Sequence, residues 1–195
     1  MNQYIKSLEE SDKINRVLNK RTWKPPKNPF IISGPCSVES EDMIVMWAKK
    51  MESIGIDALR GGAYKPCTYP ITKEVGNNGW KEGLREEGLK HLMTAKKETG
   101  LPIVSEIMDI RQINQLSMDT IDIIQVGTRN FQNYSLLDEF GKLDKPILLK
   151  RGTWATIDEI LGAVERVMVG GNNKVMICLR GVVGMPSYRN VFTSL

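Results

Sequence analysis

The chain has 195 residues, of which 41% are hydrophobic and 26% are charged, with a formal net charge of +4 and a pI near 8.9. This length suits one sizeable core, and no apolar run approaches the roughly 18 residues of a membrane-spanning helix. Three widely spaced cysteines and a polar start without a signal-peptide core predict a reducing, cytoplasmic location. Lysine and arginine are interspersed with acidic residues, so we expect small anions as partners, and neither nucleic acid nor membrane.

Residues 1–28 are predicted to form an extension with an amphipathic helix followed by an extended lead-in. From residue 29 onward, an apolar run ends at a glycine or polar stop and a helical stretch follows. Ser40 is predicted to cap the first of these helices, with Met43, Trp47, Met51 and Ile54 on one face. The six apolar runs are PFIISG, IDALRGGAY, LPIVSEIM, IDIIQVGT, KPILLKRG and KVMICLRG.

Runs this apolar on both faces, separated by helices, indicate a parallel sheet covered on both sides. No G-x-G-x-x-G or P-loop motif supports a nucleotide-binding open sheet. We therefore expect an α/β fold of the (β/α)₈ TIM-barrel type, incomplete in this chain, with about six β/α units forming one domain over residues 29–195. In such barrels the reactive side chains gather at the carboxyl ends of the strands.

Polar and reactive residues follow the predicted strands at their carboxyl ends. Cations converging on one rim would repel each other unless an anion lay between them, so the pattern predicts a small phosphorylated carboxylic acid as ligand. Glu106 and Gln125 are expected to orient a water or a catalytic lysine, or to be ordinary polar residues. Cys36, taken alone, is most often a small buried hydrophobe. The converging strand-end cations are Arg60, Lys65, Arg129, Lys150 and Arg180, and Arg151 follows Lys150 at the end of the fifth strand.

Several long stretches in the same order resemble the type I 3-deoxy-7-phosphoheptulonate (DAHP) synthases, a group that includes the 3-deoxy-octulosonate 8-phosphate synthases. The similarity covers roughly residues 30 to 190. It implies a transferase of aromatic amino acid biosynthesis that condenses phosphoenolpyruvate with erythrose 4-phosphate and releases phosphate, with a divalent metal polarising the aldehyde. The matching stretches are GPCSVES, LRGGAYKPCTYP, IDIIQVGTRNFQNYSLL, KPILLKRGTWATIDEILGAVE and CLRG.

The resemblance also implies roles for individual residues. Phosphoenolpyruvate would meet Arg60 and Lys65 on its carboxylate side, and Arg129, Lys150 and Arg180 on its phosphate, with Gln125 in the same substrate-binding set. Lys65, Pro66 and Thr68 match the motif that holds the aldose phosphate. Lys65 and Glu106 are the predicted catalytic residues. Cys36 matches a ligand of the divalent metal, which is manganese, iron, cobalt or zinc in the family.

The sequence departs from the family pattern at three points. Cys67 stands where relatives have an arginine for the sugar phosphate, and Leu179 stands where they usually have glutamate. The family's remaining metal ligands lie on two further strands, and His91 is expected on a helix surface, away from any metal. We therefore expect a homo-oligomer or a partner chain that completes the barrel. The alternatives are a noncatalytic anion-binding or regulatory protein and, with little support, a nucleic-acid module.

Overall fold

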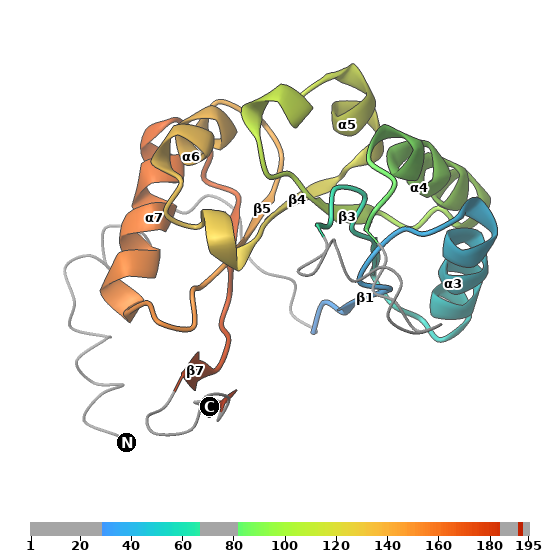
Figure 1. The fold of residues 1–195 in the computed structure, drawn as a ribbon, viewed down its shortest axis with the longest axis horizontal. Helices are drawn as coiled ribbons and strands as arrows, with labels where there is room; N and C mark the ends of the chain where they lie inside the picture. The colour runs from blue at the N-terminus through green and yellow to red at the C-terminus, as the bar shows by residue number, and fades with distance from the viewer. Residues whose placement is uncertain (1–28, 67–81, 184–190, 193–195) are drawn as a thin grey trace. The chain divides into compact units, whose positions relative to one another are not determined.

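The structure is a computed structural model that describes residues 29–66, 82–183 and 191–192. The chain divides into two compact units, one covering Pro26–Gln125 and the other containing Val126–Leu195. Figure 1 shows the elements coloured along the chain. The predicted N-terminal helix, Cys67 and Thr68 lie outside the described residues. The domain boundaries expected at residues 28 and 29 therefore stay a prediction.

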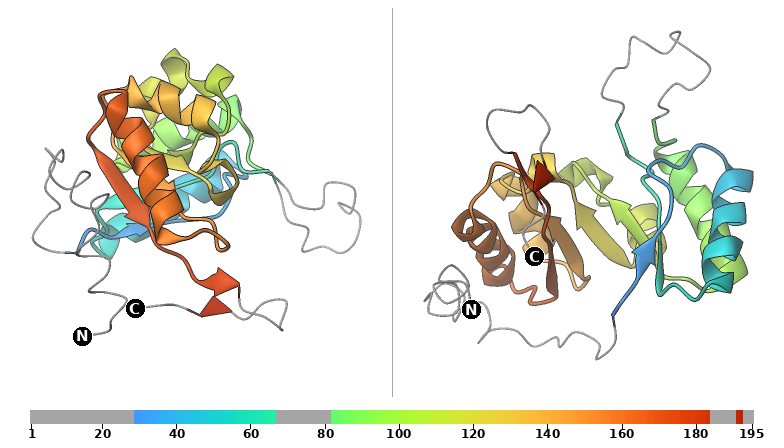
Figure 2. Two further views of the ribbon diagram at one scale, coloured as in Figure 1. Left: turned by 90° about the vertical axis from the view of Figure 1, so that its left-hand side faces the viewer. Right: turned by 90° about the horizontal axis from the view of Figure 1, so that it is seen from below.

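The first unit contains parallel strands that follow one another in chain order. Ile32 pairs with Ala58, Leu59 with Ile103, and Val104 with Ile123. Figures 1 and 2 show helices α3 and α4 side by side next to these strands. The elements are β1 (Ile32–Ser33), α3 (Glu41–Ser53), β2 (Ala58–Arg60), α4 (Glu86–Thr99), β3 (Ile103–Glu106), η2 (Ile110–Gln112), α5 (Gln115–Thr120) and β4 (Ile123–Val126), whose last residue belongs to the second unit.

The second unit has a parallel pair, β5 and β6, in which Lys150 lies opposite Cys178. Helices α6 and α7 pack against each other beside this pair. After β6 the chain continues into a short antiparallel pair, β7 with β8. The elements are η3 (Thr128–Asn130), α6 (Tyr134–Gly141), β5 (Ile147–Lys150), α7 (Ile157–Val169), β6 (Val175–Cys178), β7 (Val182–Val183) and β8 (Val191–Phe192).

All six predicted apolar runs contain a strand, and the predicted fold class, an incomplete (β/α)₈ barrel, is confirmed. Every residue of β3 and β4 is buried. Such burial on both faces explains why these runs read as continuously apolar, without the alternation of a half-exposed strand.

Helix α3 begins where the sequence predicts, since the Ser40 hydroxyl accepts a hydrogen bond from the Met43 amide at 3.2 Å. The predicted face of this helix is partly wrong. The buried residues are Ile44, Ala48 and Met51, whereas Ile54 is 67% exposed. Packing between α3 and α4 selects the buried face, and that packing is a tertiary contact that the spacing of large apolar residues did not indicate.

His91 lies on α4 as predicted, on the side that faces the start of α3. Its side chain is 16% exposed, and Nδ1 lies 3.0 Å from Oε2 of Glu41 at the start of α3. The imidazole thus joins the two helices. Among the helices that the structure describes, none has the length and apolar character needed to cross a bilayer.

Candidate functional site

Arg60, the last residue of β2, is fixed by uncharged oxygen atoms. Its Nη1 atom donates to the backbone carbonyls of Pro35 and Cys36, each at 3.0 Å, and its Nε donates to Oε1 of Gln125 at 3.3 Å. Within the described residues, Nη2 has no hydrogen-bond partner. The Arg60 side chain is only partly buried, so a ligand can reach this nitrogen. This leaves a charged donor available to a ligand.

Gln125 connects Arg60 to a buried acid. Gln125 and Glu106 lie opposite each other in the register of β3 and β4, and Nε2 of Gln125 donates to Oε2 of Glu106 at 2.9 Å. The two residues are 1% and 4% exposed. The other Glu106 oxygen, Oε1, is buried and lacks a partner among the described residues. The structure therefore brings together Arg60, Gln125, Glu106 and the backbone of Cys36.

Two glycines let this part of the chain close up. Gly34 has φ of +146°, and a Cβ built on it would lie 2.0 Å from the Arg60 carbonyl oxygen. A Cβ on Gly62 would lie 2.5 Å from the Cys36 carbonyl oxygen and 2.8 Å from Cβ of Lys65. Only glycine fits such approaches. The stretches GPCS and RGGAYK are thus brought together by backbone contacts.

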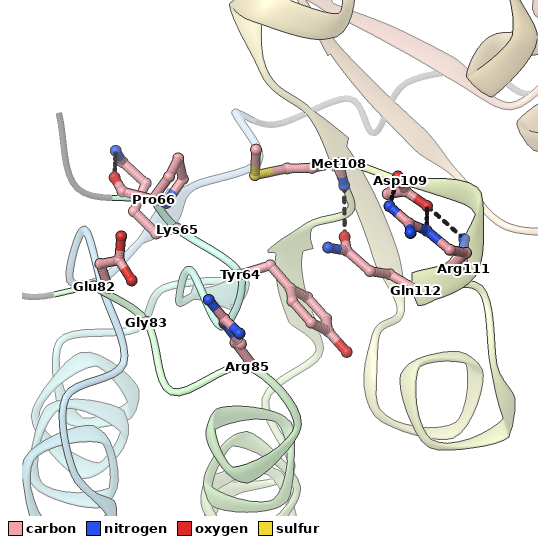
Figure 3. A pocket seen from close by; sticks show the side chains of 10 residues that line it. All are labelled: Tyr64, Lys65, Pro66, Glu82, Gly83, Arg85, Met108, Asp109, Arg111 and Gln112. Atoms are coloured by element: carbon pink, nitrogen blue, oxygen red, sulfur yellow. Dashed lines mark hydrogen bonds and ion pairs between the residues drawn. The ribbon is translucent and has the colours of Figure 1, made fainter. Parts of the chain in front are cut away.

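Lys65 and Pro66 line a pocket of about 390 Å³, distinct from the hydrogen-bonded set around Arg60. The Lys65 ammonium donates to the Pro66 carbonyl at 3.0 Å. Figure 3 shows Lys65 and Glu82 toward one side of this pocket, Tyr64 and Arg85 in the middle, and Arg111 toward the other side. Its lining residues are Tyr64, Lys65, Pro66, Glu82, Gly83, Arg85, Met108, Asp109, Arg111 and Gln112.

Charges in this pocket differ in how far they are compensated. Arg111 holds Asp109 through two side-chain bonds of 2.8 Å, and these bonds lower the pKa of the Asp109 carboxyl to about 2. Burial, helped by the charge of Glu86, raises the pKa of the Tyr64 phenol. Arg85 is exposed and adopts a φ of +57°, which is uncommon for a residue with a side chain.

In the second unit, Arg180 is held by another uncharged oxygen. Its Nη1 atom donates to the hydroxyl of Thr128 at the start of η3. Lys150 is half-buried at the end of β5, and Arg129 is exposed in η3. The predicted residues Arg129, Lys150 and Arg180 thus occupy the segments that follow or end their strands, as expected.

Arg151 orders the loop that carries Arg180. This side chain is 4% exposed, and it donates to the backbone carbonyls of Ala155 and Arg180, each at 2.5 Å. Its Nε atom is buried without a partner in the described part of the chain. A buried guanidinium with several carbonyl acceptors fixes backbone segments that are distant in sequence.

Cations on the helices and outer loops behave differently from those at the strand ends. Within the described residues, none of the ion pairs includes Arg60, Lys65 or Arg180. A cation held by neutral oxygens keeps its charge available for an anionic ligand. The cation–carboxylate pairs are Lys49–Glu98, Lys96–Asp122, Arg111–Asp109, Lys142–Glu139, Arg166–Asp138 and Lys174–Asp144.

Cys36, the predicted metal ligand, follows β1 and is exposed. In the part of the chain that the structure describes, no group of three or more His, Cys, Asp or Glu side chains is placed to hold a metal ion. A catalytic divalent ion requires about three protein ligands. The described residues by themselves therefore do not fit the metal that the resemblance implies.

The family model described as the DAHP synthetase I family matches residues 25–194, which is most of the chain. The chain belongs to the DAHP synthetase I family. A phospho-2-dehydro-3-deoxyheptonate aldolase of Thermotoga maritima is 40% identical over 152 residues, which are 78% of this chain and 42% of that protein. A 2-dehydro-3-deoxyphosphooctonate aldolase of Thioalkalivibrio sulfidiphilus is 23% identical over 157 residues, which are 78% of this chain and 54% of that protein.

Solved structures agree with this membership of the DAHP synthetase I family. The crystal structure of the Thermotoga maritima DAHP synthase superposes with a TM-score of 0.74 at 36% identity, over 86% of this chain and 46% of that one. A truncated form of the enzyme from the same organism gives a TM-score of 0.72 at 34% identity, over 89% and 60% of the two chains. The chain thus spans about half the length of the curated relatives it matches.

Sequence reasoning missed several residues that the structure places near the predicted ones. Tyr64, Arg85 and Arg111 line the Lys65 pocket, but they lie on different elements and no local motif marks them. The sequence places Arg151 at a strand end and predicts no role for it. Its position directly after Lys150 was the available signal, because successive strand residues point to opposite faces.

Proposed function

We propose that this chain forms the phosphoenolpyruvate-binding part of an enzyme that condenses phosphoenolpyruvate with an aldose phosphate and releases phosphate. The observation that carries the proposal is the way Arg60 is held: three neutral oxygens orient the guanidinium, and no carboxylate of the described residues compensates its charge. Membership of the family supports the same choice of ligand. A guanidinium in this state suits the carboxylate of phosphoenolpyruvate, to which the remaining nitrogen, Nη2, can donate a charge-assisted hydrogen bond.

The residues of the first unit have distinct tasks in this proposal. Arg60 binds the carboxylate side of phosphoenolpyruvate through Nη2. The free buried oxygen of Glu106 accepts a hydrogen bond from a water at the reacting carbon, and Lys65 supplies a proton or a compensating charge. The assignment of the phosphate to Arg129, Lys150 and Arg180 stays a prediction from the resemblance.

The aldose phosphate is proposed to bind at the pocket that Lys65 and Pro66 line. Lys65 and Arg85 offer two cationic groups there, and the pocket volume of about 390 Å³ accommodates a small phosphorylated sugar. Erythrose 4-phosphate is the proposed partner substrate. A divalent metal, if bound with Cys36 as one ligand, would polarise its aldehyde carbonyl, and the remaining ligands would have to come from outside the described residues.

A noncatalytic anion-binding protein is the second candidate. It is favoured by one observation, namely that the described residues contain no group of three or more His, Cys, Asp or Glu side chains placed to hold a metal ion. In that case phosphoenolpyruvate would bind to Arg60 without being consumed. The assembly is a further proposal: either several copies of this chain or a separate chain completes the barrel, and the native mass in solution distinguishes a monomer from both.

Calorimetry with phosphoenolpyruvate tests the shared part of both candidates. We expect binding to the full chain and at least a tenfold loss of affinity in Arg60→Met, because the carboxylate loses its charged donor. Arg166→Met, which removes an exposed arginine paired with Asp138, is the matched control and should bind normally. Absence of phosphoenolpyruvate binding to the wild type would overturn the proposal.

A measurement of phosphate release then distinguishes the catalytic candidate from the noncatalytic anion-binding candidate. With phosphoenolpyruvate, erythrose 4-phosphate and manganese present, the catalytic proposal requires phosphate to appear at a rate that depends on both substrates. Binding of phosphoenolpyruvate without any phosphate release from the assembled particle would favour the noncatalytic protein.

A further inference from the structure

The described residues contain a row of three polar side chains, in which Glu106 and Gln125 are buried and Arg60 is partly buried. The acid and the guanidinium do not touch each other in this row. Nε2 of Gln125 donates to Glu106 at 2.9 Å, and Oε1 of Gln125 accepts from Nε of Arg60 at 3.3 Å. A neutral amide therefore stands between two groups that would form an ion pair if they met directly.

Chemistry allows this amide only one orientation. A guanidinium has donors and no acceptor, so it must face the amide oxygen. A carboxylate only accepts, so it must face the amide NH₂ group. Gln125 is 1% exposed, which removes water as an alternative partner. Glu106 thus locks the amide, and the amide in turn locks Nε of Arg60.

Fixing Arg60 directly with a carboxylate would hold the guanidinium equally well, but it would neutralise its charge. A bound carboxylate neighbour stabilises a cation in place and competes with any anionic ligand for the same donors. The two other acceptors on Arg60, the carbonyls of Pro35 and Cys36, are also uncharged. All three contacts therefore orient the group and leave its charge uncompensated.

We propose that Gln125 is a positioning residue that transmits the anchoring effect of Glu106 to Arg60 while keeping the two charges apart, so that Arg60 presents a preoriented and uncompensated guanidinium to an anionic ligand. This inference rests on the proposed function for the identity of the ligand. It goes further because it attributes the ligand affinity to which of the two side chains contacts Arg60. The amide of Gln125 on β4 makes this contact, and the acid of Glu106 on β3 lies behind the amide.

Exchanging the two side chains tests this order. The double variant Glu106→Gln with Gln125→Glu keeps the net charge, the side-chain volumes and the number of hydrogen bonds, but it places the carboxylate against Arg60. We expect the double variant to unfold at the same denaturant concentration as the wild type and to bind phosphoenolpyruvate at least tenfold more weakly. The single variant Gln125→Glu is expected to lose affinity in the same way and replaces the double variant if that one does not fold. Gln115→Glu, an exposed change of the same chemical kind on α5, should have no effect.

A second measurement does not depend on phosphoenolpyruvate. Phenylglyoxal reacts with the neutral form of a guanidine, and a carboxylate partner reduces that form. Mass spectrometry of the peptide containing Arg60 should show severalfold slower modification in the exchanged variant than in the wild type. Wild-type protein that fails to bind phosphoenolpyruvate but shows this difference in rate would refute the proposed function and leave the role of Gln125 standing. Affinity and modification rate both unchanged by the exchange would overturn the inference.

Discussion

The guanidinium of Arg151 donates from Nη2 to the backbone carbonyl of Arg180 at 2.5 Å, and from Nη1 to the carbonyl of Ala155 at the same distance. A side chain that is 4% exposed thereby ties the segment after β6 to the segment after β5. The strand-end position of Arg180 depends on a residue that does not itself face the solvent.

Replacing Arg151 with methionine should lower the free energy of unfolding by about 2–4 kcal/mol, because the two carbonyls lose charged donors in a buried environment. Chemical denaturation measures the loss. Arg166→Met removes an exposed guanidinium from α7 and should leave the unfolding midpoint nearly unchanged. Equal behaviour of the two variants would contradict the anchoring role of Arg151.

The pair Asp109–Arg111 predicts a pH effect. The folded pKa of Asp109, about 2, is lower than its ordinary value of 3.8. The pair therefore contributes stability above pH 3.8, and this contribution is lost as the pH falls toward 2. In Arg111→Gln the Asp109 pKa should return toward 3.8, as followed by NMR titration of the carboxyl carbon. A titration midpoint that stays near 2 in the variant would show that a group other than Arg111 lowers the pKa of Asp109.

Replacing glycine with alanine is expected to change the stability in opposite directions at two positions. Gly34→Ala should destabilise the chain by at least about 2 kcal/mol, because its Cβ would overlap the Arg60 carbonyl at a strained φ. Gly162→Ala in the middle of α7 meets nothing within 4 Å and should stabilise by about 0.5–1 kcal/mol. Thermal unfolding of both variants gives the comparison. Gly34→Ala should also weaken anion binding, since the backbone of Arg60 must shift.

A cavity made in α4, which packs against α3, is expected to lower the free energy of unfolding. Leu92 is fully buried on α4, and Leu92→Ala should lower the free energy of unfolding by about 2–5 kcal/mol. Ile54, at the end of α3 and 67% exposed, provides the control, because its truncation should change stability by less than about 0.5 kcal/mol. A similar small effect at both sites in denaturant titrations would indicate that the helix interface is not a packed core.

Much of the fold was readable from local pattern. The strands IVSE and IIQV are buried along their whole length, and the apolar residues at their starts were the local signal of that burial. Ser40 begins α3 as predicted, and Gly100 ends α4 in the left-handed conformation that glycine favours. The strand-end positions of Arg60 and Lys150 followed from the same runs.

The sequence by itself determined the parallel strand–helix alternation and the kinds of side chain that end each strand, because both depend on residues adjacent in the chain. Only the tertiary structure decided that Arg60 is held by Gln125 and Arg180 by Thr128, that Arg111 is neutralised by Asp109, and that His91 joins two helices. These outcomes depend on strand register and on the close approach of backbones at glycines, which join residues that are distant in sequence. Whether a strand-end charge is compensated is settled by its neighbours in space, and no local pattern encodes them.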